Sequence, residues 1–157
     1  ALGAYSRDVK LKEQYMEKMR CLVALLPDGT YEMDQSYFMH HLQDHKGYWT
    51  KKLIDLLGEP RKRDEPLTEK HYAIAYAIQE ITEAVVTHML NWLSEETGCE
   101  NLSVSGGVFM NSVMNGKIYR SNLFKNVFIP PAIHDGGLST GSALSVYHNT
   151  LKYPRIL

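Results

Sequence analysis

The sequence predicts an α/β fold, and three of its patterns indicate this class. In the last third of the chain a strand, a glycine turn and a helix follow one another twice, which is typical of a parallel strand pair with helices packed on it. A long helix is expected over about residues 71–96, and a β-hairpin over about 21–33. The length of 157 residues and the 44% of hydrophobic residues suit one globular domain.

Residues 1–70 are expected to form the hairpin together with short helices and loops. Leu11, Tyr15 and Met19 recur at four-residue spacing, which indicates an amphipathic helix within the first 20 residues. Two β-prone runs flank Pro27-Asp28-Gly29, and this turn signal predicts the hairpin.

Two short helices and a loop are expected after the hairpin. Asp34 is a candidate N-cap for a short helix over Tyr37–His45. A further helix with four apolar residues is expected to end at Gly58, because glycine followed closely by proline is a helix stop signal. The charged segment 59–68 lies between prolines and is expected to be a solvated loop.

Residues 71–157 are expected to form the α/β region that holds a nucleotide site. Apolar residues recur at three- and four-residue spacing along the long helix and predict one continuous buried face, made by Ile74, Ile78, Ile81, Val85, Met89 and Trp92. Strands are expected at 101–105 and 126–129, with helices at about 110–120 and 139–151.

Composition argues against several classes of protein. Seventeen basic and eighteen acidic residues give a net charge of -1, whereas a nucleic-acid binder usually carries a basic excess, so no nucleic-acid partner is expected. No apolar run suits a membrane span or a signal peptide, and two cysteines form no disulfide framework. We therefore expect a cytoplasmic location without a membrane partner. Because the chain starts at Ala1 rather than Met, we also expect it to be part of a longer protein.

The two glycine pairs are the candidate binding loops. Ligands of open α/β sheets bind beyond the carboxyl ends of the strands, where Gly106-Gly107 and Asp135-Gly136-Gly137 are both expected to lie. Glycine lets backbone approach a ligand closely, and the N–H groups of a following helix favour phosphate. An aspartate at this place can hold a metal ion or a ribose. The two loops together predict a shared nucleotide site, although each can also be a simple turn.

A histidine cluster offers a different interpretation. His41 and His45 lie four residues apart, next to His40, so a helix would place two imidazoles on one face, a spacing that suits zinc. An exposed polar helix explains the same residues, and no fourth ligand is evident. The sequence has neither a Gly-x-Ser-x-Gly elbow nor a Gly-x-x-x-x-Gly-Lys-Ser/Thr phosphate loop, so it favours a nucleotide or metal site over covalent catalysis.

Long segments of the sequence resemble the O-carbamoyltransferases of antibiotic and nodulation-factor biosynthesis. The resemblance is most specific in Leu102–Ile118, with its Ser-Gly-Gly-Val-Phe-Met-Asn motif, and in Val127–Leu144, with its Phe-Ile-Pro-Pro-Ala-Ile-His-Asp-Gly-Gly motif. Shorter stretches at 28–38, 57–61 and 74–79 also resemble the family.

The resemblance implies a large two-part enzyme. Its amino-terminal domain is of the actin-like ATPase (ribonuclease H-like) type, and this chain resembles the second half, one partial domain over 1–157. A carboxy-terminal YrdC-like domain makes carbamoyl adenylate from carbamoyl phosphate and ATP. The amino-terminal domain, with a divalent metal that is often iron, passes the carbamoyl group to a hydroxyl of a small-molecule acceptor. The expected partners of this chain are therefore that acceptor, the upstream lobe and the YrdC-like domain.

The resemblance also assigns individual residues. Gly106 and Gly107 match the Gly-Gly that approaches the adenylate phosphates, and Asn111 matches an Asn at the start of the helix lining the site. Asp135 matches a metal-binding aspartate, with Gly136 and Gly137 in the loop beside it. Held there, the metal would polarise the carbamoyl carbonyl or the phosphate.

The histidines depart from the family pattern. The family's metal-binding His-x-x-x-His segment precedes the hairpin, whereas His41 and His45 follow it, so the metal role is not carried over to them. Without the true pair and the YrdC-like domain, the isolated chain is expected to bind metal and nucleotide weakly and not to catalyse transfer. The alternatives are a threonylcarbamoyl-transfer protein or kinase-like ATPase of the same superfamily, a non-catalytic nucleotide-binding module, and a zinc module built on the three histidines.

Overall fold

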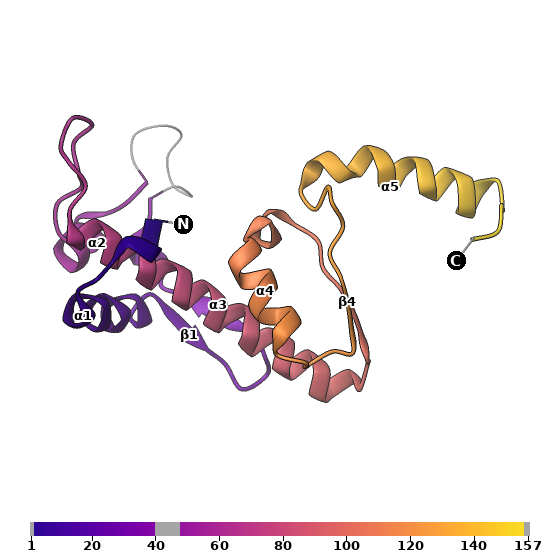
Figure 1. The fold of residues 1–157 in the computed structure, drawn as a ribbon, viewed down its shortest axis with the longest axis horizontal. Coiled ribbons are helices and arrows are strands. Elements are labelled where there is room, and N and C mark those ends of the chain that lie inside the picture. The colour runs from indigo at the N-terminus through magenta and orange to yellow at the C-terminus, as the bar shows by residue number, and fades with distance from the viewer. Residues whose placement is uncertain (1, 40–47, 156–157) are drawn as a thin grey trace. The chain divides into compact units, whose positions relative to one another are not determined.

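The chain forms two compact units, Ala1–Leu93 (unit 1) and Ser94–Leu157 (unit 2). The structure is a computed structural model that describes residues 2–39 and 48–155 (Figure 1). Helices combine with a two-stranded antiparallel sheet and a two-stranded parallel sheet, so the predicted α/β class is confirmed.

The core of unit 1 forms between two helices. After a 3-10 turn at Leu2–Tyr5, α1 (Val9–Arg20) begins where the carboxylate of Asp8 accepts a hydrogen bond from the backbone N–H of Leu11, at 3.0 Å. Its predicted apolar face is confirmed, since Tyr15 and Met19 are buried. They pack in one cluster with Ala73 and Ala77 of the long helix α3 (Glu69–Thr97).

The predicted hairpin is confirmed. Strand β1 (Val23–Leu25) pairs antiparallel with β2 (Tyr31–Met33), and Val23 lies opposite Met33. Gly29 closes the turn at a φ of +77°, in the left-handed region that glycine adopts without strain. A Cβ on Gly29 would lie 2.3 Å from Cγ of Trp92, so the turn packs directly against α3.

The buried face predicted for the long helix is confirmed in part and otherwise wrong in its position. Ile74 and Ile81 are partly buried and pack against the core cluster. Ile78, Met89 and Trp92 are exposed by 50%, 42% and 39%. The buried residues form a different stripe: Ala73, Ala77, Glu83, Val86 and Leu90. Bulky apolar residues dominate a hydrophobic pattern, whereas close packing of two helices selects small side chains, and here α1 packs against the alanines.

The helix predicted over Tyr37–His45 is wrong where it can be compared. A 3-10 helix spans Gln35–Tyr37, and Phe38 is extended and forms an antiparallel bridge with Trp49. The remainder of that prediction falls on residues 40–47, outside the described residues. The next helix, α2 (Lys51–Leu57), ends at Gly58 as predicted.

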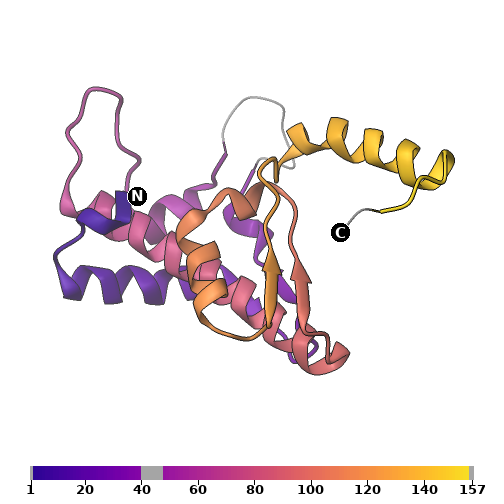
Figure 2. The same ribbon diagram turned by 45° about the vertical axis from the view of Figure 1, so that its right-hand side comes forward.

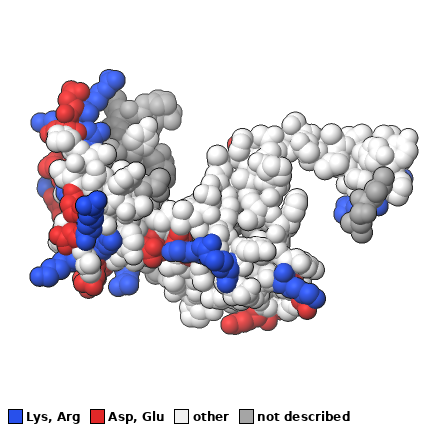
Figure 3. All heavy atoms as spheres, in the orientation of Figure 1, with Lys and Arg blue, Asp and Glu red and all other residues white. Residues whose placement is uncertain are grey.

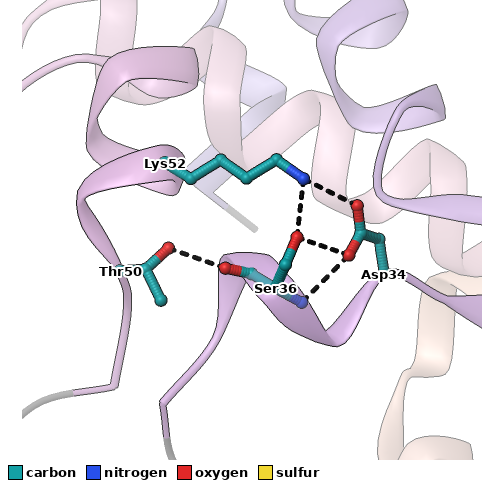
Figure 4. Close-up of polar contacts among 4 residues, drawn as sticks. All are labelled: Asp34, Ser36, Thr50 and Lys52. Carbon is teal, nitrogen blue, oxygen red and sulfur yellow. Dashed lines mark hydrogen bonds and ion pairs between the residues drawn. The ribbon is translucent and has the colours of Figure 1, made fainter.

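An ionic cluster ties the exit of the hairpin to α2 (Figure 4). The ammonium of Lys52 donates to Asp34 Oδ2 at 2.8 Å and to the hydroxyl oxygen of Ser36 at 2.6 Å. Asp34 Oδ1 accepts from the hydroxyl and the backbone N–H of Ser36, at 2.5 and 2.9 Å. The hydrogen bond from Lys52, reinforced by those from Ser36, lowers the pKa of Asp34 to about 2.

Unit 2 is built on a parallel strand pair (Figure 2). Strand β3 (Asn101–Ser103) pairs in register with β4 (Asn126–Phe128), as the repeated strand–glycine–helix pattern predicts. Helix α4 (Ser112–Arg120) lies beside them in both views and buries Met114 and Ile118. The last helix, α5 (Leu138–Ser145), continues as a π-helix over Val146–Thr150.

The segment 138–151 has an uncharged surface. It contains no Asp, Glu, Lys or Arg, and it is white in Figure 3, whereas charged side chains cover much of unit 1 in that view. Leu138, Leu144, Val146 and Leu151 are all more than half exposed. No helix among the described residues is both long and apolar enough to cross a membrane.

The packing of Gly29 predicts a steric penalty at the hairpin turn. Gly29→Ala should lower the free energy of unfolding by roughly 2–4 kcal/mol, because it combines a left-handed backbone with a methyl group that meets the Trp92 ring. Gly98→Ala is the matched control, since Gly98 has a φ of +61° and nothing within 4 Å of its Cβ position. Thermal unfolding should therefore give the larger loss at Gly29. Equal losses would show that Trp92 imposes no constraint.

The Asp34 cluster predicts a dependence of stability on pH. A carboxyl with a lowered pKa stabilises the fold above its ordinary value of 3.8, and this contribution is lost as the pH falls toward 2. Asp34→Asn should therefore flatten the fall in melting temperature between about pH 5 and pH 2. Asp64→Asn, in the exposed 59–68 loop, is the control and should keep the wild-type profile. An unchanged profile in Asp34→Asn would contradict the assignment.

Candidate functional site

Two loops leave the same edge of the parallel sheet in unit 2. The first follows β3 and runs through Gly106 and Gly107 into a 3-10 turn, η3 (Gly107–Met110), and then α4. The second follows β4 and reaches another 3-10 turn, η4 (Asp135–Gly137), ahead of α5. Because the strands are parallel, both loops begin at the carboxyl ends of their strands, the edge where open α/β sheets bind ligands.

A backbone hydrogen bond joins the two loops. The N–H of Gly106 donates to the carbonyl of Ile133 at 2.8 Å, beyond the last ladder bond, in which the N–H of Val104 donates to the carbonyl of Phe128. Gly106 has a φ of +108°, which side chains rarely allow. Asp135 follows Ile133 by two residues, so its Cα lies within about 7 Å of the Cα of Ile133.

The first loop carries the unengaged donors. Gly107 and Val108 are the first residues of η3, and no acceptor in the described part of the chain engages their N–H groups. A Cβ on Gly107 would meet nothing within 4 Å, so this glycine borders open space. Free N–H groups at such a turn suit an anion such as a phosphate.

Asn111 lies where the resemblance implies, at the start of the helix. Its Oδ1 accepts from the backbone N–H of Met114 at 3.2 Å and so caps α4. The cap sets the point at which the chain leaves η3 and enters α4, and it therefore fixes one end of the first loop.

The glycines of the second loop have a different use for their N–H groups. The N–H of Gly136 donates to Nδ1 of His134 at 3.0 Å, and that of Gly137 donates to the carbonyl of the same residue at 2.9 Å. A Cβ on Gly136 would lie 2.6 Å from Cε1 of His134, and one on Gly137 would lie 2.2 Å from the carbonyl oxygen of Ala132. The loop's own packing thus accounts for both glycines.

Asp135 offers one exposed carboxylate. No group of three or more Asp, Glu, His or Cys side chains placed to hold a metal ion occurs within residues 2–39 and 48–155. His134 adds no ligand in this conformation, since its Nδ1 accepts from Gly136 and a neutral imidazole then carries its proton on Nε2. These residues alone do not make a complete metal site, and His40, His41 and His45 lie outside the described residues.

The sequence pattern did not single out His134 or Asn115. His134 caps η4 through its ring nitrogen, and the placement of a hydrogen-bonding side chain directly before Asp-Gly-Gly is the signal that could have indicated it. Asn115 binds the first loop from within α4, at a distance of 2.6 Å from its Nδ2 to the carbonyl oxygen of Phe109. An asparagine inside the helix predicted at about 110–120 is a comparable signal, because asparagine is not a strong helix former.

A separate apolar pocket of about 170 Å³ lies in unit 1. Leu53, Ile54 and Leu57 of α2 and Ile74 of α3 line it, and Trp49 completes the apolar wall. The apolar wall suits an apolar group. Of the residues that line the pocket, the basic side chains of Arg61 and Lys70 are the ones suited to contact a phosphate.

Fold and loops together define an α/β protein in which a glycine turn at the edge of the parallel sheet carries two N–H groups that no acceptor among the described residues engages. Residues 2–144 match the family described as carbamoyltransferase N-terminus, and the chain belongs to this family. The resemblance found in the sequence is thereby confirmed.

Three relatives illustrate the family. The chain is 42% identical over 137 residues to the Synechocystis protein sll1178, covering 87% of this chain and 22% of that protein. It is 38% identical over 112 residues to nodulation protein NolNO of Sinorhizobium fredii, covering 67% and 16%. For nodulation protein NolO of Bradyrhizobium diazoefficiens the identity is 32% over 134 residues, covering 80% and 24%. The chain thus spans less than a quarter of the length of each.

Proposed function

We propose that this chain is part of a carbamoyltransferase and supplies its phosphate-binding loop. The whole enzyme would transfer a carbamoyl group from carbamoyl adenylate, made from carbamoyl phosphate and ATP, to a hydroxyl of a small-molecule or glycoside acceptor. The family match supports carbamoyl transfer in general. The observation that carries the loop's role is the pair of unengaged N–H groups at Gly107 and Val108.

The proposed loop would stabilise the anionic part of the adenylate. When the acceptor hydroxyl oxygen bonds to the carbamoyl carbon, the hydroxyl proton passes to solvent, the bond from that carbon to the phosphate oxygen breaks, and AMP leaves with an added negative charge. Backbone donors held in place before the reaction stabilise such charge without reorganising. Gly106 supports this role indirectly, because its own N–H donates to the carbonyl of Ile133 and so anchors the loop that carries the two donors.

We further propose that Asp135 contributes one ligand to a divalent metal, with iron as the candidate. Its exposed carboxylate is a suitable hard ligand, and the bond between Gly106 and Ile133 keeps its loop attached to the first one. The remaining ligands would come from other parts of a longer polypeptide. No step of the reaction is assigned to the metal here, since one carboxylate does not make a site.

The other parts of that polypeptide are also the proposed partners of this chain. A two-stranded sheet is only marginally stable alone, and parallel sheets are normally covered on both faces. The uncharged segment 138–151 with its exposed leucines has the composition of a helix packed against protein. Both features, and the greater length of the relatives, support one lobe of an actin-like domain within a larger enzyme.

Gly107→Ala tests the proposed loop. The methyl group enters the open space beside the free N–H groups, so nucleotide affinity should fall roughly tenfold or more while the free energy of unfolding stays within about 0.5 kcal/mol. Calorimetry on the full-length protein with AMP, the nucleotide that leaves in the proposed transfer, measures the affinity. Gly141→Ala is the matched control, because Gly141 in α5 also has nothing within 4 Å. Wild-type affinity in Gly107→Ala would contradict the proposal.

Asp135→Asn tests the metal assignment. Loss of the carboxylate charge should weaken manganous ion binding by the full-length protein roughly tenfold or more, measured by calorimetry without nucleotide. Asp64→Asn removes an exposed aspartate elsewhere and should leave metal affinity unchanged. Tight, stoichiometric metal binding that survives Asp135→Asn would remove Asp135 from the site.

A further inference from the structure

Asn115 connects α4 to the first loop through one hydrogen bond. Its side-chain nitrogen Nδ2 donates to the carbonyl oxygen of Phe109 at 2.6 Å. Phe109 belongs to η3, the turn that begins with Gly107 and Val108. The amide group of Asn115 therefore reaches back from α4 to the carbonyl of Phe109, the residue that follows Gly107 and Val108.

The other end of the same amide has no hydrogen-bond partner among the described residues. Asn115 Oδ1 is buried, and no donor among the described residues reaches it. A buried acceptor without a partner costs about 1–3 kcal/mol, a cost that an apolar side chain of similar volume would avoid. Stability alone therefore does not explain an asparagine here, and the contact made by Nδ2 is what distinguishes it from leucine.

That contact closes a short chain of hydrogen bonds across the loop. The N–H of Phe109 donates to the carbonyl of Gly106 at 3.1 Å, and the N–H of Gly106 donates to the carbonyl of Ile133. Both sides of Phe109 are thus held, its N–H by the glycine turn and its carbonyl by Asn115. The peptide groups of Gly107 and Val108 lie between Gly106, which is held by Ile133, and Phe109, and these two anchored residues restrict their orientation.

We propose that Asn115 is a positioning residue for nucleotide binding: it orients the free N–H groups of Gly107 and Val108 without touching the ligand. The inference rests on the proposed function, in which these groups bind the phosphates. A fixed loop binds more tightly than a mobile one because less conformational entropy is lost on binding. Asn115 thus contributes to affinity more than to the stability of the fold.

The test replaces Asn115 by leucine, which keeps most of the volume and removes both the donor and the orphan acceptor. In the full-length protein, Asn115→Leu should raise the Kd of AMP about five- to tenfold. Amide hydrogen exchange should speed up at 107–110 but not in the rest of α4, and the melting temperature should not fall. Asn126→Leu is the matched control, since Asn126 Nδ2 also donates a hydrogen bond, 2.7 Å long, to Asn101 at the opposite end of the strands.

Asn115→Ala serves as a second variant that cannot clash. If the wild-type protein binds the nucleotide and both Asn115 variants bind it as tightly as the wild-type protein does, the positioning role is wrong while the proposed function stands. Faster exchange throughout α4 and β3 together with a lower melting temperature in both variants would show a purely structural role and would also overturn the inference. If the wild-type protein does not bind the nucleotide, the proposed function fails, and this inference fails with it.

Discussion

The hydrogen bond from the N–H of Gly106 to the carbonyl of Ile133 is the interaction on which the candidate site depends. It joins the two loops beyond the paired strands β3 and β4. Gly106 has a φ of +108°, a backbone conformation that costs most residues several times the thermal energy. Because its own N–H donates to Ile133, Gly107 and Val108 are the proposed phosphate donors of this loop.

The two units show different relations between side chains and structure. In unit 1, side-chain contacts determine the geometry. Ala73 and Ala77 pack against α1, and Trp92 packs against the hairpin turn. The ion pair between Asp34 and Lys52 joins α2 to the hairpin. In unit 2, backbone hydrogen bonds and three side-chain hydrogen bonds determine the geometry. The three side chains are those of Asn111, Asn115 and His134. A loop built in this way presents its own peptide N–H groups to a ligand. Such groups suit the binding of an anion.

Much of the fold follows from sequence patterns, because caps, turns and helix stops are local. The hairpin at Pro27-Asp28-Gly29, the stop at Gly58 and the repeated strand–glycine–helix unit needed no distant information. The buried stripe of α3 did, since the choice between Ala73 and Ile78 depends on which helix packs against it. The uses of Gly136 and Gly137 were equally hidden, because an Asp-Gly-Gly sequence does not reveal that His134 takes both N–H groups.

A loop whose donors are its own backbone is best tested by locating the ligand atoms. The most direct measurement is a crystal structure of the full-length protein with AMP. We expect a phosphate oxygen about 3 Å from the backbone nitrogen of Gly107 or Val108, with the bond between Gly106 and Ile133 intact. Phosphates bound away from this turn, with both N–H groups still facing solvent, would contradict the central claim.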